Sequence, residues 1–398
     1  MPLNYRRLVE AHTRSQPSER GRVVSGTRHA FEDAGIRDSF DLGRLFEECF
    51  GWEEFRACRR DRQTRTAHQV FEAAGAVSTA AFQNIMGQWA YTTFLQAYAA
   101  PELVFSKIIP TRSSPFKTER IPGISNIGDE ALVVDEAKDY PIAGVSENWI
   151  ETPETLKRGF IVPCSWEALF FDRTGQVRGQ LGQLGTWLGV NKEKRAIDCV
   201  IDAGETAQNK YRYRWLGNVI ATYGSNSGSH TWNNQLAATP LSDYTSLQAA
   251  WNVFKQLTDP FTGEPLDIMP KDIVVPPLLA WAVPFATGGA VRRANPGYAT
   301  TGNPTVTEIN NPSDSIMGQL RTLTSQLLRT RLGSDTTWFV GDVARAVAYM
   351  ENLPLEVTTA PAGSEAEFTR DIVLRTKVRE MGTYSTQEPR AMVKVLAS

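Results

Sequence analysis

The sequence has little of what disulfide-rich, metal-binding or membrane-spanning proteins need. Its 398 residues include four cysteines, Cys49, Cys58, Cys164 and Cys199, with no CxxC spacing. Cysteines scattered in this way predict free thiols in a reducing compartment. No window approaches the roughly 20 consecutive apolar residues of a transmembrane helix, and the polar, arginine-rich N-terminus is no secretion signal. We therefore expect no membrane partner.

Motifs of catalysis and cofactor binding are missing as well. The chain has no P-loop, no HExxH and no GxSxG. Its four histidines, His12, His29, His68 and His230, lack ligand spacing, so a solvated or structural role is expected for each. The glycines of GQLGQLGTWLG lie inside an apolar helical pattern, which a phosphate-binding loop would not have. We predict no catalytic residue, no cofactor and no metal site.

Lysine is absent from the first 106 residues, whereas residues 1–76 contain thirteen arginines. Acidic residues nearly balance them, and the formal net charge of the whole chain is −2, so no global attraction to nucleic acid is expected. One dense basic run is formed by Arg56, Arg59, Arg60, Arg62 and Arg65. Such a run is usually the solvated face of a helix. Contact with nucleic acid or with an acidic neighbour is the alternative.

Two apolar patterns at helical spacing follow one another in the N-terminal quarter. Leu42, Leu45, Phe46 and Phe50 predict a short amphipathic helix. Residues 76–98 predict a longer helix with a broad apolar face. That face is formed by Phe82, Ile85, Met86, Trp89, Phe94 and Leu95.

A third helical pattern runs through the middle of the chain. Ser165 is suited to cap a helix that begins near Trp166. Further on, one stripe is formed by Val177, Leu181, Leu184 and Leu188, and the opposite face carries Gly175, Gly179, Gly182 and Gly189. Each glycine costs a helix up to ~1 kcal/mol relative to alanine. We therefore expect another backbone or sheet to approach the glycine face closely.

Between these helices, residues 103–163 are rich in proline, glycine and β-branched residues. LVFSKII, PFKTERI, ALVVDEA, NWIET and TLKRGFIVP read as short strands separated by turns. A long two-stranded ribbon fits this pattern, and because an isolated ribbon is marginally stable in water, we expect a partner to cover it. An acidic cluster surrounds Lys138: Asp129, Glu130, Asp135, Glu136 and Asp139. Its simplest interpretation is a charged surface that meets basic neighbours, with metal binding as the alternative.

The C-terminal half predicts an α/β unit over about residues 204–349. We expect an amphipathic helix over Asp243–Leu257, a buried strand at DIVVPP and a short helix from Leu278 that ends near Pro284. LRTLTSQLL and TTWFVGDV read as strands. The final stretch, residues 355–396, is strand-like, includes the charged FTRDIVLRTKVRE and ends in EPRAMVKVLAS.

The order of these segments resembles the major capsid proteins of tailed phages, which share the α+β Hong Kong 97 (HK-97-type) fold, and is nearest to the Mu-type major head subunits. Four stretches carry the resemblance in order. They are the helix followed by the strand-rich region, FIVPCSWEALFFDRTGQVRGQLGQLGTWLG, WFVGDVARAVAYMENLPLEV and AEFTRDIVLRTKVREMGTYSTQEPRAMVKV. The last is the most specific, because a charged strand, a turn, Glu-Pro-Arg and a terminal strand occur together.

The resemblance implies an N-terminal arm (1–111), an E-loop (112–157), a peripheral domain with a spine helix (158–204), an axial domain (205–348) and closing peripheral strands (349–398). Copies would assemble in the bacterial host cytoplasm into the pentamers and hexamers of an icosahedral shell around double-stranded DNA. Portal and scaffolding proteins would be partners, with a decoration protein as a further candidate. The arginine run would face the DNA. Glu130, Asp135, Glu136, Lys138 and Asp139 would contact a neighbouring subunit.

Two family features are not carried over. Many relatives begin with a scaffolding segment that a protease removes, whereas this chain begins at Met1, so we expect either no cleavage or the uncleaved form. The Lys–Asn cross-link of the type member is not expected, because the sequence nominates no partner for Lys138.

Three other functions remain open. An encapsulin-like nanocompartment uses the same fold, although encapsulins resemble shorter chains without an arginine-rich arm. A DNA-binding protein would use the basic run and show salt-dependent affinity. A hydrolase would need a cleft with perturbed titratable groups, and no residue pattern nominates one.

Overall fold

The chain divides into two compact units, each built from three stretches. Unit 1 comprises Met1–Glu102, Lys157–Asn191 and Leu353–Met381, and unit 2 comprises Leu103–Leu156, Lys192–Asn352 and Gly382–Ser398. The computed structural model describes residues 4–15, 19–53, 76–99, 101, 103–122, 149–165, 174–203, 211–215, 217–225, 232–258, 265–287, 292–293, 308–309, 320–360 and 372–397. The five-part division expected from the sequence stays a prediction.

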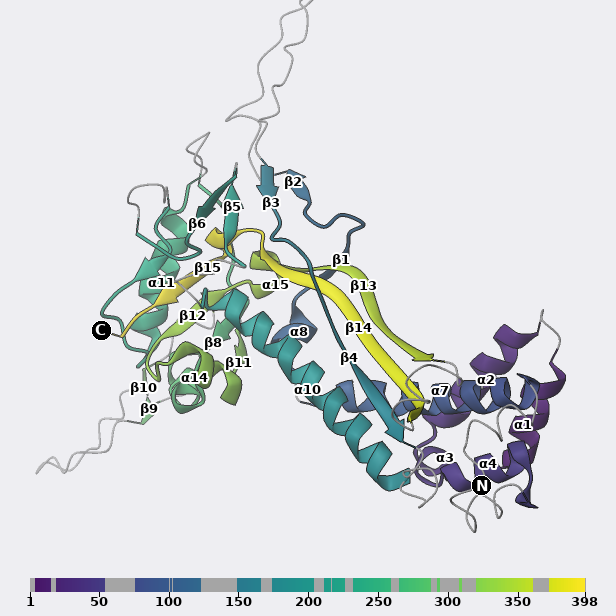
Figure 1. The fold of residues 1–398 in the computed structure, drawn as a ribbon. Helices are drawn as coiled ribbons and strands as arrows, with labels where there is room; N and C mark the ends of the chain where they lie inside the picture. The colour runs from purple at the N-terminus through teal and green to yellow at the C-terminus, as the bar shows by residue number, and fades with distance from the viewer. Residues whose placement is uncertain are drawn as a thin grey trace, which may run out of the picture. The chain divides into compact units, whose positions relative to one another are not determined.

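Figure 1 labels the elements in chain order. The described helices are α1 (Tyr5–Arg14), α2 (Arg20–Glu32), α3 (Ala34–Asp38), α4 (Leu42–Phe50), α7 (Ala76–Ala99), α8 (Phe105–Ile108), α10 (Thr174–Val200), α11 (Tyr244–Gln256), α12 (Val283–Thr287), α14 (Gln326–Leu332) and α15 (Val343–Ala346), with the 3-10 turns η1 (Pro277–Leu279) and η2 (Pro389–Ala391).

The described strands alternate with these helices along the chain. They are β1 (Thr111–Ser113), β2 (Arg120–Pro122), β3 (Trp149–Glu151), β4 (Leu156–Ser165), β5 (Tyr213–Trp215), β6 (Asn218–Ile220), β7 (Gln235–Leu236), β8 (Asp272–Val274), β9 (Arg292–Arg293), β10 (Glu308–Ile309), β11 (Arg321–Leu323), β12 (Trp338–Gly341), β13 (Val347–Ala360), β14 (Ile372–Thr386) and β15 (Met392–Val395). The sequence of α10, β13 and β14 contributes to both units.

An aromatic core in unit 1 holds α1 to α4 against α7. Phe40 meets Phe31 edge-on at 5.4 Å between ring centroids and stacks on Trp89 at 4.8 Å. The Tyr5 hydroxyl accepts the Asp41 N–H at 2.7 Å and so fixes the start of α4. The helices of this N-terminal stretch pack as a bundle, because their apolar residues share one core in which to be buried.

Both helices expected in the N-terminal quarter are confirmed. Helix α4 begins after Asp41, whose carboxylate accepts the Gly43 N–H at 2.8 Å as an N-cap. Its buried residues include Leu42, Leu45, Phe46 and Phe50. Helix α7 covers the expected segment and buries Phe82, Ile85, Met86, Trp89 and Phe94.

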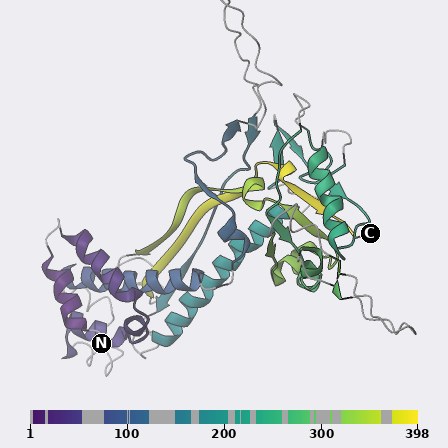
Figure 2. The ribbon, with the colours of Figure 1, turned by 180° about the vertical axis from the view of Figure 1, so that it is seen from behind.

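Helix α10 carries glycines in two different environments. A Cβ added at Gly185 would lie 2.8 Å from the Phe94 oxygen, and one at Gly189 would lie 2.6 Å from the Tyr98 oxygen. Both oxygens belong to α7, which runs beside α10 in Figures 1 and 2. The predicted close approach is thus confirmed at Gly189. The predicted close approach is wrong at three other glycines, where an added Cβ would meet no described atom within 4 Å. These are Gly175, Gly179 and Gly182.

The apolar stripe of α10 is also confirmed. Val177, Leu181 and Leu188 are buried, and Leu184 packs against the same cores. The cap expected at Ser165 falls on the last residue of β4, and residues 166–173, where the helix was expected to begin, lie outside the described residues. The described helix begins at Thr174.

Strands β1, β13, β14 and β4 form one sheet in that order. The charged segment FTRDIVLRTKVRE was expected to be a strand, and the described strand β14 confirms this from Ile372 onward. In unit 1, β4 approaches β14 so closely at Gly159 that any side chain there would collide with the Val378 carbonyl oxygen. This position therefore requires glycine.

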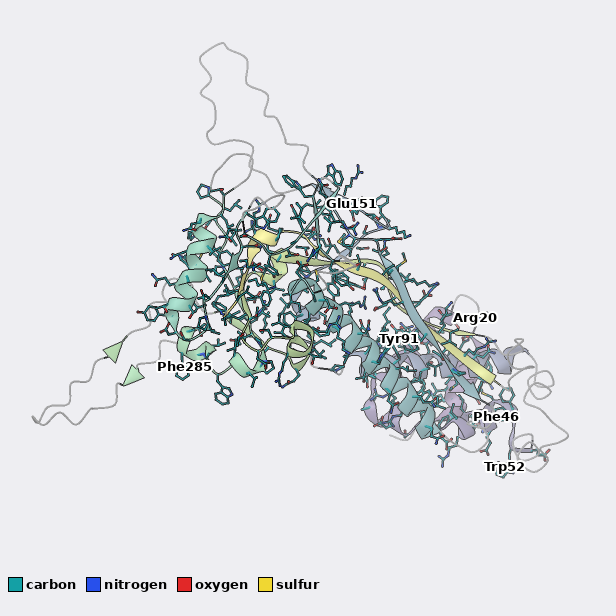
Figure 3. The ribbon with its side chains drawn as sticks, turned by 60° about the vertical axis from the view of Figure 1, so that its left-hand side comes forward. Arg20, Phe46, Trp52, Tyr91, Glu151 and Phe285 are labelled. Carbon is teal, nitrogen blue, oxygen red and sulfur yellow. The ribbon has the colours of Figure 1, made fainter. Side chains whose placement is uncertain are left out.

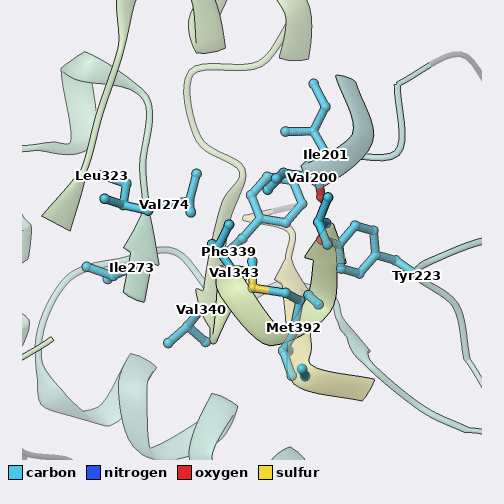
Figure 4. Packing of buried hydrophobic residues seen from close by; sticks show 14 of the residues in the cluster. Val200, Ile201, Tyr223, Ile273, Val274, Leu323, Phe339, Val340, Val343 and Met392 are labelled. Carbon is cyan, nitrogen blue, oxygen red and sulfur yellow. The ribbon is translucent and has the colours of Figure 1, made fainter. Parts of the chain in front are cut away.

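Unit 2 is built around a five-stranded sheet with the order β11-β8-β12-β15-β7. Helix α11 packs against this sheet and is capped by Asp243, which confirms the expected helix over residues 243–257. The expected buried strand is β8, whose Ile273 and Val274 are fully buried. Figure 4 shows these residues with Phe339, Val340 and Met392 in the same core.

Four short segments differ from the sequence predictions. LVFSKII contains helix α8 and LRTLTSQLL contains the strand β11 followed by helix α14, which Ser325 caps through the Leu327 N–H. TTWFVGDV is a strand only until Gly341, because Asp342 caps α15. The helix expected to end near Pro284 instead divides into η1 and α12, and Pro284 lies in the first turn of α12, where a missing N–H costs nothing.

Candidate interaction surfaces

Neither predicted set of contact residues falls within the described part of the chain. The basic run of Arg56, Arg59, Arg60, Arg62 and Arg65 lies between Glu53 and Ala76, the nearest described residues. The acidic cluster with Glu130, Asp135, Glu136, Lys138 and Asp139 lies between β2 and β3. Both sets stay predictions. The described residues show which contacts join the two ends of the segment that contains the acidic cluster, residues 123–148.

The ends of segment 123–148 are joined by an antiparallel pair, β2 with β3, in which Arg120 is opposite Glu151. Beyond the pair, Thr152 and Glu119 exchange two hydrogen bonds of 2.9 Å, one of them through the Thr152 hydroxyl. The Arg120 guanidinium lies over the Trp149 ring at 4.1 Å, a cation–π contact. The predicted two-stranded pairing is confirmed at this root. The β2–β3 pair extends into a larger sheet of the same chain, because β3 also pairs with β5 and β5 with β6.

A loop next to this root presents an exposed aromatic side chain. The Asn352 amide donates to the carbonyl oxygens of Ser114 at 2.8 Å and Phe116 at 2.6 Å. The Phe116 side chain is nevertheless 61% exposed. A large apolar side chain on a backbone that is already ordered loses little entropy on contact, so it is suited to bind another surface.

The C-terminal part of α10 anchors the segment that leads into β1. Glu193 is fully buried, and its carboxylate accepts the backbone N–H groups of Val104, Phe105 and Ser106 at 2.8 to 2.9 Å. Three charge-assisted hydrogen bonds satisfy the free N–H groups at the start of α8. This tertiary contact explains why LVFSKII forms a helical turn despite its β-branched composition.

Two further carboxylates, one in the last turns of α10 and one just beyond its end, bind other elements of unit 2. Asp198 forms a two-point ion pair with Arg331 of α14, with one contact of 2.6 Å to Nε. Asp202 accepts from Arg212 Nε at 3.0 Å and from the Thr222 N–H at 3.1 Å. The end of α10 therefore binds three parts of unit 2: the segment before β1, helix α14 and the residues that flank β5 and β6.

The Glu-Pro-Arg triplet forms a buried turn between β14 and β15. Glu388 accepts the Arg390 N–H at 3.1 Å and binds its guanidinium at two points. Beside it, the buried Asn234 amide donates to the Pro389 and Thr222 carbonyl oxygens, at 2.9 and 2.8 Å. Sequence reasoning noticed the triplet but not Asn234, which has no local pattern that would single it out.

Unit 2 also exposes a patch of apolar side chains over η1 and α12. Trp281 is 84% exposed, and Leu278 and Phe285, three and four residues away, are more than half exposed. Figure 3 labels Phe285. Large apolar side chains that are exposed close together in the sequence are suited to contact with another molecule.

Two chemical features of the described residues concern metal ligands and thiols. No group of three or more His, Cys, Asp or Glu among them is placed to hold a metal ion. Burial raises the pKa of the Cys49 and Cys199 thiols to about 12, so neither is a thiolate nucleophile at neutral pH. Across the same part of the chain, no helix has the length and apolar content to cross a membrane.

Comparison with known proteins gives one family match. The family described as "Phage capsid protein" matches residues 150–395. No curated protein matches the chain. The matched range contains β4, α10, the five-stranded sheet and the closing strands β13 to β15.

Several solved structures are similar at low identity. A chain of Gordonia phage Cozz is 13% identical, with 72% of this chain and 85% of that chain covered and a TM-score of 0.39. A chain of Microbacterium phage Oxtober96 is 15% identical, with coverage of 74% and 92% and a TM-score of 0.41. A virus-like particle from Pyrococcus furiosus is 8% identical, with coverage of 77% and 97% and a TM-score of 0.41.

Proposed function

Because the chain belongs to the phage capsid protein family, we propose that it is the major head subunit of a tailed phage and that its copies close an icosahedral shell around double-stranded DNA. The more general part of this function follows from membership of the family alone. The protein is a structural shell protein of the virion that assembles with copies of itself, and it is not an enzyme. Its mixed helix-and-sheet architecture is the Hong Kong 97-type α+β fold expected from the sequence.

The observation that carries the proposal is the extent of the family match, which runs from β3 to the last strand. In this proposal the axial domain spans residues 205–348 and the peripheral domain residues 158–204 and 349–398. The E-loop, residues 112–157, lies over an adjacent subunit, and the subunits form pentamers and hexamers. The order of the sequence segments favours a Mu-type head subunit.

The contacts at the end of α10 support a structural role for the spine helix. Glu193 binds residues 104–106, Asp198 binds α14, and Asp202 binds Arg212 beside β5. Buried charge-assisted bonds are short and directional, so they hold these elements in a fixed arrangement.

We propose three partners besides copies of the chain: DNA, a portal protein and a scaffolding protein. The arginine run from Arg56 to Arg65 faces the packaged DNA, and portal and scaffolding proteins join the shell during assembly in the host cytoplasm. The run supplies five fixed positive charges in ten residues, a density suited to phosphate contacts.

The test of the DNA assignment is the nucleic-acid content of particles assembled from the full chain. We expect nuclease-protected DNA in wild-type particles and less of it after reversal of Arg59, Arg60 and Arg62 to glutamate, with particle yield unchanged. Reversal of the exposed Arg20 and Arg22 of α2 is the matched control. Particles filled with a protein cargo and free of nucleic acid would instead identify a nanocompartment.

A further inference from the structure

The helices α1 to α4 share their core with the rest of unit 1. We call residues 5–50, which contain these four helices, the N-terminal bundle. One cluster of buried side chains combines residues of the N-terminal bundle with residues of α7, β4 and α10, all of them in unit 1. A segment that folds as a separate domain has a hydrophobic core of its own. The shared cluster indicates that the N-terminal bundle and the rest of unit 1 fold as one body.

Helix α7 contributes two aromatic rings to this shared core. Trp89 is fully buried, and its ring stacks on that of Phe40 at 4.8 Å. Phe82, two helical turns earlier, meets Phe46 edge-on at 6.0 Å and lies 5.8 Å from the Phe50 ring. Without the N-terminal bundle both rings would meet water, and the cost of exposure grows with the apolar area.

Polar contacts join the same two parts. The Trp89 indole donates to the Arg37 carbonyl oxygen at 3.4 Å, and Arg28 Nε donates to Gln88 Oε1 at 3.0 Å. The Arg28 guanidinium also lies over the Tyr91 ring at 4.2 Å, a cation–π contact. Helix α7 therefore satisfies polar groups of α2 and α3 as well as covering their apolar side chains.

Helix α10 and strand β4 complete the contact. Val162 of β4 and Val177 and Leu181 of α10 are buried in the shared core. Beside them, Arg178 Nη2 of α10 lies 3.0 Å from Asp38 Oδ1 at the end of α3. The N-terminal bundle thus contacts elements more than a hundred residues further along the chain.

We propose that the N-terminal bundle is a permanent part of the folded subunit and stays bound to unit 1 even when the chain is cut between α4 and α7. The inference goes beyond the proposed shell function, because it concerns which residues a finished subunit contains. Buried apolar contacts do not depend on an unbroken backbone, so a protease that cut there would leave the bundle in place.

A segment that a protease removes, as in many relatives, is the alternative role for these helices. The face of α7 that the bundle covers argues against it. Four of its side chains, each at most 2% exposed, follow one another at helical spacing: Phe82, Ile85, Met86 and Trp89. Removal of the bundle would leave a contiguous apolar surface, which is typical of a liability to aggregation.

The experiment uses the full chain with a recognition sequence for a specific protease, flanked by glycine and serine, inserted between Glu53 and Ala76. The unassembled protein is cleaved, and a denaturing gel confirms the cut. Size-exclusion chromatography then shows whether residues 1–53 remain with the rest of the chain. We expect the two pieces to elute together, and urea to separate them only at concentrations that also unfold the helices, as followed by circular dichroism.

Two alanine variants relate this retention to the shared core. Phe46→Ala removes a fully buried ring that meets Phe82, and we expect it to raise the dissociation constant of the cleaved bundle by about a hundredfold and to lower the urea midpoint of release. Ile161→Ala shortens a side chain of unit 1 that is 55% exposed and should leave release unchanged. Retention by the wild-type sequence is measured independently of both variants.

Two results would overturn the inference. Release of residues 1–53 without urea would identify a removable segment. Equal urea midpoints for Phe46→Ala and the wild type would show that the shared core does not hold the bundle. Because the cleaved protein is unassembled, neither result bears on the shell function, which microscopy of the intact chain tests separately.

Discussion

The carboxylate of Glu388 and the guanidinium of Arg390 form a two-point ion pair of 2.7 and 2.9 Å, although both side chains are almost completely buried. A buried pair of this kind contributes little net stability compared with apolar residues of the same volume. Removing one partner, however, leaves a buried charge without compensation. The Glu-Pro-Arg triplet is therefore sensitive to single substitutions.

Glu388→Gln should lower the free energy of unfolding by about 3 kcal/mol, because it removes the charge that compensates Arg390. Urea unfolding of the unassembled protein measures the change. The double variant Glu388→Met with Arg390→Met is the control and should be more stable than the single variant. A single variant as stable as the wild type would show that the pair does not hold the turn.

Glu193→Ala should release the segment before β1. Three N–H groups lose their acceptor, and with about 1 kcal/mol or more for each bond the cost is roughly 3 kcal/mol. Hydrogen exchange at residues 104–106 should accelerate well before global unfolding. Glu193→Gln keeps an acceptor oxygen, so its exchange rate at these residues should lie between those of the wild type and Glu193→Ala. Unchanged exchange in Glu193→Ala would rule out the anchor.

The glycines of α10 offer a matched pair of substitutions. Gly189→Ala should destabilise the protein, since its Cβ would lie 2.6 Å from the Tyr98 oxygen. Gly182→Ala meets no described atom and should stabilise the unassembled chain by up to about 1 kcal/mol, the helix-propensity difference. Thermal unfolding compares both with the wild type. Equal effects at the two positions would contradict the close contact between α7 and α10.

His12 should make the N-terminal bundle sensitive to acid. Burial lowers the pKa of this histidine, whose Nε2 lies 2.9 Å from the Thr27 hydroxyl oxygen. The unfolded chain then binds a proton more readily than the folded one. The stability is fully present above the ordinary histidine pKa of about 6.5 and is lost as pH falls through the lowered value.

Melting temperatures between about pH 7.5 and pH 5 measure this dependence. His12→Gln has no titrating group at this position and should lose less stability on acidification than the wild type. If the two proteins lost the same stability, other groups would be responsible and the assignment to His12 would fail.

Periodic apolar patterns predicted the elements that bury one face along their whole length. Helices α4, α7 and α11 and strand β14 follow from such patterns, because helical or alternating burial repeats over several residues and dominates local preferences. The same reasoning predicted the glycine contact at Gly189, although not at Gly185, which meets Phe94 in the same way.

Short elements were mispredicted where a distant side chain decides the local structure. LVFSKII has a strand-like composition, yet Glu193, nearly ninety residues away, stabilises a helical turn there. The one signal was the pair of carboxylates Glu193 and Asp198 near the end of α10, with Asp202 just beyond it. The sequence around Asn234 carries no such signal, because the hydrogen-bond partners of this residue come from two separate segments.

Electron microscopy of the purified full chain over a range of salt concentrations shows whether the protein forms a shell. We expect closed icosahedral particles or rings of subunits. A monodisperse monomer under every condition, with neither rings nor particles, would contradict this expectation.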